Sequence, residues 1–256
     1  MRVPLRLGFD VFETGAISSA REEMIVKTMR AYKDLMEVYE VTSYKVCATS
    51  AMRDAQNASY IIDRVKKETG LSINVISGDE EASVFYHTTI TELFDKEHAY
   101  LYIDVGGGST ELTLFNENQI AFKESFNIGT IRLLKEQVEE HLWNEMKEYI
   151  KEITKLEKDV IAVGSGGNIN KVFSLSKKKD GKPLPLELLK DYYRELSNFS
   201  VQERMKLYNL REDRADVIVP ALQIYINVMR WANAEQILVP KIGLVDGIIQ
   251  QLHAEL

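Results

Sequence analysis

The alternation of apolar and polar positions is most informative in the middle of the chain, where it predicts a β-hairpin around a glycine-rich loop. Residues 99–105 form an apolar run, broken only by Asp104, that is typical of a buried strand. Three glycines follow at 106–108, and a second apolar run at 112–115 resumes a strand. A dinucleotide-binding loop would open into a helix instead. The pattern therefore predicts a hairpin whose glycine loop can approach a ligand closely.

The segment before this hairpin alternates strands with helices, and helical spacing begins at a capping serine. The expected elements are a short extended piece at 3–7, a helix at 18–39, strands at 44–48 and 71–76, a helix at 59–69 that stops at Gly70, and a helix that opens at 79–81. This order predicts a parallel, right-handed layer.

After the hairpin the pattern becomes mainly helical, with two further short strands. The expected elements are a helix over 131–156 with a break, a strand at 159–163, a helix from 169, helices at 186–196, 200–208 and 213–231, a strand at 237–239, and a closing helix at 243–254.

Composition narrows the class of protein. A chain of 256 residues, 45% hydrophobic and 28% charged, is typical of a soluble globular protein with one large or two modest domains. No apolar run approaches the roughly 20 residues of a membrane span, so we expect no membrane contact. The net charge of −7 argues against DNA binding, although a local pocket can still be positive. The single cysteine, Cys47, excludes an internal disulfide and favours a reducing, cytoplasmic location.

Five motifs, in order along the chain, are similar to those of the exopolyphosphatase / guanosine pentaphosphate phosphatase (Ppx/GppA) family. They lie at residues 48–53, 78–82, 104–111, 164–168 and 214–220. The resemblance implies an α/β, two-domain, actin-like (ASKHA, ribonuclease H-like) fold with the site between the domains. It also implies Mg²⁺-assisted hydrolysis of a terminal phosphoanhydride bond in polyphosphate or in guanosine pentaphosphate (pppGpp). We expect the first domain at 1–97, with 246–256 packing back on it, and the second at 98–245.

The residues of the predicted loop suit that chemistry. Removing a terminal phosphoryl group requires its oxygens to be held and its charge to be neutralised. Asp104 and Glu111 are hard oxygen ligands suited to one Mg²⁺; the alternative is that they only hold the loop by hydrogen bonds. The candidate phosphate-binding groups of the two glycine-rich segments are Gly106, Gly107, Gly108, Ser109, Thr110, Gly164, Ser165, Gly166 and Gly167.

The catalytic residue implied by the family motif is Glu81, as the general base, with Glu80 in a supporting role. Both glutamates also suit the first turn of a helix for electrostatic reasons alone. Arg53 follows a strand and can clamp phosphate through its guanidinium, unless it forms an ordinary surface salt bridge. Arg132 is a weaker candidate of the same kind.

The chain departs from the family at its beginning, because family members start with a hairpin that carries the first phosphate loop. We therefore expect an incomplete first domain with an exposed sheet edge, which favours a homodimer or recruitment of another strand. The alternative function is a catalytically impaired member that binds polyphosphate or a nucleotide. A kinase of the same superfold is a third, less favoured interpretation.

Overall fold

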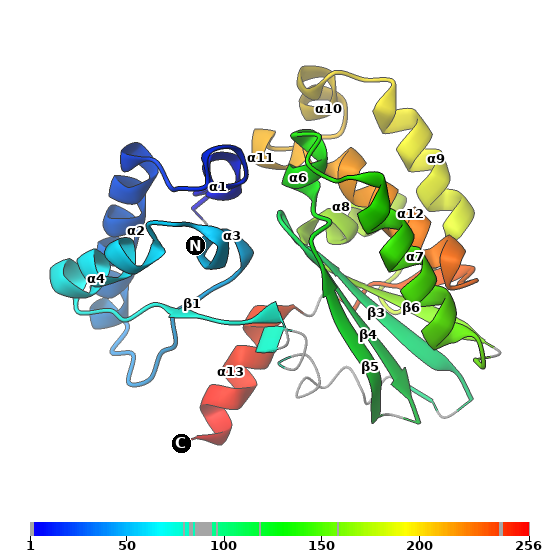
Figure 1. Cartoon of the computed structure of the whole chain (residues 1–256), viewed down its shortest axis with the longest axis horizontal. Helices are drawn as coiled ribbons and strands as arrows, with labels where there is room; N and C mark the ends of the chain where they lie inside the picture. Colours follow the sequence, from blue (N-terminus) through cyan, green and yellow to red (C-terminus); the bar gives the residue numbers. More distant parts are fainter. Residues whose placement is uncertain are drawn as a thin grey trace.

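The structure is a computed structural model, and it describes residues 3–78, 80–81, 84, 94–95, 97–117, 119–157, 159–240 and 243–255. Figure 1 shows two lobes, the first built from the blue and cyan N-terminal elements and the second from the green to orange ones. Within these described residues, two strands form the sheet of the first lobe and six form that of the second. Among the described residues, no helix combines the length and the hydropathy that a bilayer crossing requires.

The first lobe packs helices against a short parallel pair of strands. Its elements are α1 (Gly8–Thr14), α2 (Ser19–Val38), β1 (Cys47–Ala48), α3 (Ser50–Asp54), α4 (Ala58–Thr69) and β2 (Asn74–Val75). As predicted, Ser18 caps α2, Gly70 ends α4 in the left-handed conformation, and β1 and β2 are parallel. Ile25, Ile61 and Val65 are buried in a core separate from that of the second lobe.

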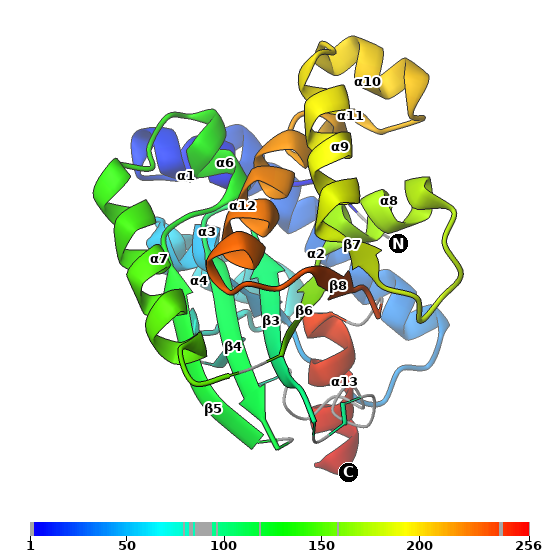
Figure 2. The same ribbon diagram turned by 90° about the vertical axis from the view of Figure 1, so that its right-hand side faces the viewer.

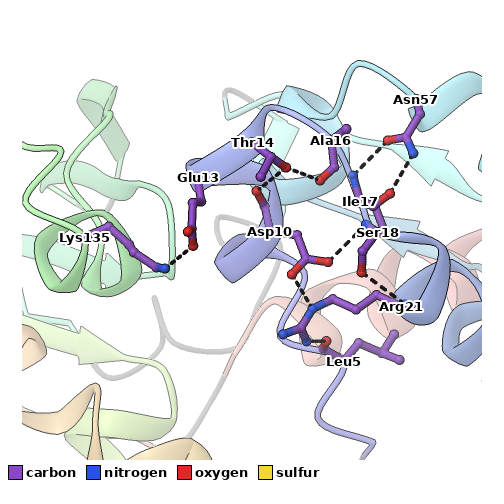
Figure 3. Close-up of polar contacts among 10 residues, drawn as sticks. All are labelled: Leu5, Asp10, Glu13, Thr14, Ala16, Ile17, Ser18, Arg21, Asn57 and Lys135. Atoms are coloured by element: carbon purple, nitrogen blue, oxygen red, sulfur yellow. Dashed lines mark hydrogen bonds and ion pairs between the residues drawn. The ribbon is translucent and has the colours of Figure 1, made fainter.

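The N-terminal segment differs from its prediction. Residues 3–6 form no strand, and the chain turns directly into α1. Figure 3 shows how α1 is fixed: Asp10 accepts hydrogen bonds from Arg21 (2.7 Å) and from the backbone N–H of Ser18 (3.0 Å), while Arg21 also donates to the carbonyl of Leu5 (2.5 Å). The extended prediction was wrong because these tertiary contacts outweigh the β-propensity of a short apolar run.

The second lobe holds a mixed sheet with strand order β5-β4-β3-β6-β8-β7. Its elements are β3 (Ala99–Val105), β4 (Thr110–Asn116), β5 (Gln119–Phe126), α6 (Thr130–Leu134), α7 (Glu140–Thr154), β6 (Val160–Ser165), α8 (Gly167–Ser176), β7 (Leu184–Pro185), α9 (Leu186–Ser197), α10 (Val201–Leu207), α11 (Glu212–Ala215), α12 (Ile218–Trp231) and β8 (Gln236–Leu238). The predicted hairpin is confirmed, as is the break in the helix that follows it. The helix expected over 213–231 is instead divided into α11 and α12, and β7 was not predicted.

Strand β3 separates two apolar layers. Leu101 and Ile103 point into the main core with buried residues of α7, α8 and α12. Figure 2 shows α7 and α12 in front of the sheet. Tyr100 and Tyr102 point to the opposite face and pack with Phe115. Because side chains alternate along a strand, Asp104 belongs to the same face as the two tyrosines.

The last helix, α13 (Leu244–Ala254), lies against the first lobe. Val84 is so close to Gly247 of α13 that a side chain at the glycine would not fit. Apolar residues of α13 and α2, among them Ile248 and Met29, line a shared cavity of about 570 Å³.

Candidate functional site

A row of polar side chains crosses four strands of the second lobe. The strand registers place Asp104 of β3 opposite Glu111 of β4 on one side and Ser165 of β6 on the other. Glu111 in turn lies opposite Ser125 of β5. Directly opposed residues project to the same face of a sheet, so the hairpin brings together the two carboxylates that the sequence singled out.

Glu111 is a buried carboxylate of this row, and two hydroxyls donate hydrogen bonds to it. Its Oε1 accepts hydrogen bonds from Ser109 (2.6 Å) and Ser125 (3.0 Å). Burial nevertheless raises the pKa of Glu111, and the two serine hydroxyls oppose that rise. The pKa of Asp104 is raised to about 7, first by loss of solvent and then by the charge of Glu111. Both carboxyls are thus held in a setting that disfavours two adjacent negative charges.

The first lobe places a third carboxylate near this pair. A side chain at Gly78 would come within 2.9 Å of Ser125, so the helical turn that begins there lies directly against the polar row. Glu81, in that turn, has a pKa raised to about 8, by burial first and then by the charges of Glu111 and Asp104. Its Oε2 is buried and has no hydrogen-bond partner among the described residues. Asp79 and Ala82 of the same motif lie outside those residues.

Arg53 is a cation that acts on two of the three carboxylates. Its Nη1 lies 3.9 Å from Oε2 of Glu81 and donates a hydrogen bond to the carbonyl of Ile76 (2.8 Å). Its positive charge lowers the pKa of both Glu81 and Glu111. Arg53 therefore lies at the site rather than in an isolated surface salt bridge.

Glu80 is exposed and caps its own helical turn. Its carboxylate accepts a hydrogen bond from the N–H of Ser77 (2.8 Å), whose hydroxyl accepts one from the N–H of Glu80 (3.1 Å). These bonds lower the pKa of Glu80, with the backbone bond as the largest cause. The structure places Glu80 as a helix-capping residue at the surface, apart from Glu81.

The first glycine loop is closed by a hydrogen bond from the N–H of Gly106 to the carbonyl of Ser109 (2.9 Å). The hydroxyls of Ser109 and Thr110 are already engaged, with Glu111 and with the carbonyl of Ile128 (2.6 Å) respectively. Among the described residues, backbone N–H groups are therefore the donors that this loop has left to offer.

The second glycine segment is split between a strand and a turn. Gly164 and Ser165 are the last residues of β6, and Ser165 is 1% exposed. Gly166 has φ +101°, a conformation that requires glycine, and a Cβ there would lie 3.3 Å from Oδ1 of Asp104. Gly167 begins α8 beneath the guanidinium of Arg214. Gly167, at the end of the segment, lines a cavity.

A cavity of about 320 Å³ lies between the N-terminal segment and the two glycine loops. The polar or glycine residues of its wall are Arg6, Gly106, Gly107, Thr130, Gly167, Asn168, Asp213 and Arg214. Arg214 donates to Oδ1 of Asn168 (2.5 Å), and Arg6 is paired with Asp216. The site prediction omitted Arg214 and Asn168, although both belong to motifs that the sequence displayed. Arg6 carried no local signal.

Arg132 is placed between the lobes. Its Nε donates to the carbonyl of Gly108 (2.8 Å), its Nη2 to Asp54 (2.5 Å), and its guanidinium stacks on Phe12 at 4.2 Å.

No three described His, Cys, Asp or Glu residues are close enough to form a metal site by themselves. The donor set nevertheless suits a hard cation. Asp104, Glu111 and Glu81 all offer oxygen ligands and their carboxyls repel one another, and no described residue donates a hydrogen bond to the buried Oε2 of Glu81. Water or substrate oxygens would have to complete the coordination.

The sequence comparisons place these features in a family. The model of the Ppx/GppA phosphatase family matches residues 2–255. The chain is 31% identical over 209 residues to a bifunctional 3-dehydroquinate synthase/phosphatase of Fusobacterium nucleatum, an alignment covering 80% of this chain and 29% of that protein. It is 31% identical over 137 residues to Exopolyphosphatase 2 of Mycobacterium tuberculosis, covering 50% of this chain and 42% of that protein. The chain thus spans less than half the length of these relatives.

Solved structures share the fold. An exopolyphosphatase of Cytophaga hutchinsonii superposes with a TM-score of 0.77 at 24% identity, covering 94% of this chain and 85% of that one. A Ppx/GppA family member of Aquifex aeolicus gives a TM-score of 0.74 at 25% identity, covering 98% and 87%. The α/β, actin-like fold class predicted from the sequence is confirmed. Because the family match extends over nearly all residues and the fold agrees, the chain belongs to the Ppx/GppA phosphatase family.

Proposed function

We propose that this chain hydrolyses the terminal phosphoanhydride bond of inorganic polyphosphate or of guanosine pentaphosphate, with Glu81 as the general base. The observation that carries the proposal is the buried Oε2 of Glu81, which has no hydrogen-bond partner among the described residues, beside two further carboxylates and Arg53. Relatives named exopolyphosphatase make polyphosphate the first substrate to test.

The environment of Glu81 suits proton abstraction from water near neutral pH. A base works best when its pKa lies close to the working pH, and the pKa of Glu81 is raised to about 8. The water oxygen forms a bond to the terminal phosphorus, the bridging oxygen leaves with the electron pair of the broken P–O bond, and the water proton passes to Glu81. Free inorganic phosphate and a chain shortened by one phosphate result.

The other residues of the site bind and orient the substrate. N–H groups of the loop at Gly106–Gly108 can donate to phosphoryl oxygens, and Arg53 can neutralise charge beside Glu81. Arg214 and Asn168 line the cavity beside the glycine loops and would contact phosphates further along the substrate. A Mg²⁺ ion held by Asp104 and Glu111 would neutralise phosphate charge and favour displacement of the leaving oxygen.

Phosphate release from polyphosphate and from pppGpp, each with Mg²⁺ and with EDTA, tests the proposal. We expect Mg²⁺-dependent release from at least one substrate, and a loss of about 10²–10⁴-fold in Glu81→Gln, the range of general-base effects. Glu80→Gln is the matched control and should change the rate by less than about threefold, since Glu80 only caps its turn. Polyphosphate binding without release by the unaltered chain would instead support an impaired, binding member of the family.

A further inference from the structure

Helix α6 donates hydrogen bonds to the backbone carbonyls of the first glycine loop. The N–H groups of Thr130 and Ile131 donate to the carbonyls of Gly106 (3.0 Å) and Gly107 (2.8 Å). The carbonyl of Gly108 is bound instead by the side chain of Arg132, through Nε at 2.8 Å. All three successive glycine carbonyls are therefore turned toward the start of α6.

This arrangement decides where the loop's donors point. In a trans peptide the C=O of one residue and the N–H of the next point in opposite directions. Since the carbonyls of 106–108 face α6, the N–H groups of 107–109 face the other way. If the hydrogen bonds to α6 and Arg132 break, these peptide groups can rotate and the N–H groups lose that orientation.

Arg132 also contacts the first lobe. Its Nη2 is 2.5 Å from Oδ2 of Asp54, at the end of α3, and its guanidinium lies 4.2 Å above the ring of Phe12 in α1. Its side chain is only 20% exposed, so these contacts are partly shielded from water. One guanidinium thus joins the glycine loop of the second lobe to two elements of the first.

The first-lobe elements that Arg132 contacts are themselves fixed by hydrogen bonds within that lobe. Figure 3 shows α1 tied to its own lobe through Asp10 and Arg21, and Ile17 exchanging two hydrogen bonds with Asn57 (2.8 and 2.9 Å). The same view shows a second link across the lobes, the ion pair of Glu13 with Lys135. That pair also joins α1 to the end of α6, but neither Glu13 nor Lys135 forms a hydrogen bond with the glycine loop.

We propose that Arg132 is a positioning residue that couples the approach of the first lobe to the orientation of the glycine loop. With Asp54 and Phe12 in place, the guanidinium is held where Nε reaches the carbonyl of Gly108. When the first lobe moves away, Arg132 loses two of its three partners and the loop becomes looser. The inference rests on the proposed function only in taking the loop as a phosphate site; the coupling itself is a property of the fold.

Asp54→Ala tests the coupling, with Glu13→Ala as the matched control. Each variant removes one carboxylate that pairs with a cation across the lobes, and only Asp54 pairs with Arg132. The readout is hydrogen exchange at the amides of Thr130 and Ile131, which exchange when their bonds to the loop open. It requires no substrate and no catalytic activity, so it decides the coupling even if the chain hydrolyses nothing.

We expect exchange at these two amides to rise about tenfold in Asp54→Ala, equivalent to about 1.4 kcal/mol, and by less than about twofold in Glu13→Ala. In an Arg132→Ala background, Asp54→Ala should have no further effect, because the path through the guanidinium is already absent. Equal exchange in Asp54→Ala and the unaltered chain would overturn the proposal. So would a full, additive effect of Asp54→Ala when Arg132 is missing.

Discussion

Replacing Glu81 by Gln should make the protein more stable at pH 8 and less sensitive to pH, in addition to any effect on activity. The pKa of Glu81 rises from an ordinary 4.5 to about 8, chiefly because the side chain is buried and secondly because Glu111 and Asp104 repel its charge. The folded state therefore binds the proton more tightly than the unfolded state does. Between pH 4.5 and 8 the unfolded chain holds fewer protons, so the free energy of unfolding falls as pH rises.

The size of this effect follows from the two pKa values. At about 1.4 kcal/mol for each pKa unit, the rise corresponds to about 5 kcal/mol of stability lost between pH 4.5 and pH 9. This is an upper limit, because the remaining carboxylates share the repulsion and relax when one is removed. We expect Glu81→Gln to be about 2–3 kcal/mol more stable than the unaltered chain at pH 8, and about equal to it at pH 4.5.

Urea unfolding at half-unit steps from pH 4.5 to pH 8.5, in EDTA, measures the difference. Glu80→Gln is the matched control: its exposed carboxylate has a lowered pKa and caps a helical turn. That variant should lose only a small amount of stability, and the loss should be constant above pH 5, because a glutamine oxygen can still accept the capping hydrogen bond. If the unfolding free energies of Glu81→Gln and the unaltered chain fall in parallel across this range, Glu81 does not carry a raised pKa and the base assignment loses its electrostatic support.

Two further outcomes follow from the site. With Mg²⁺ in place of EDTA, the fall in stability between pH 5 and pH 8 should become shallower, because a bound cation favours ionised carboxylates. Asp104→Asn should weaken this effect of Mg²⁺. Thermal unfolding with and without the ion measures both. Arg214→Ala should raise the Kd for polyphosphate about tenfold or more, measured by calorimetry, whereas Arg211→Ala, which lies outside the cavity, should leave it within about twofold.

The parts of the site that the sequence predicted are those that local pattern determines. Alternation over β3 and β4, joined by a short glycine loop, was enough to place Asp104 beside Glu111, because a hairpin's register depends on its loop. Helix ends marked by Ser18 and Gly70 were found for the same reason. Each of these features depends on residues close to one another in the chain.

The parts that it missed depend on contacts between distant residues. Asp54 and Arg132 are 78 positions apart, and neither residue's neighbours indicate the other. The seven residues of α1 contain valine and two phenylalanines, which favour extended structure, and Gly15 was the only local signal that a helix ends there. The break between α11 and α12 occurs at Asp216, which is paired with Arg6, 210 residues away.

The same distant contacts explain why the site is assembled only when the two lobes meet. Asp104 and Glu111 are fixed by the second lobe alone, through strand register and the hydroxyls of Ser109 and Ser125. Glu81 comes from the first lobe, and bringing it close adds a third carboxylate to a pair that already resists ionisation. Contacts elsewhere between the lobes must offset that repulsion. The ion pairs of Arg132 and Lys135 with the first lobe, and the stacking of Arg132 on Phe12, can do so. A metal ion bound at the three carboxylates, alone or together with phosphate, would remove the repulsion itself. Binding at the site and closure of the lobes should therefore favour each other.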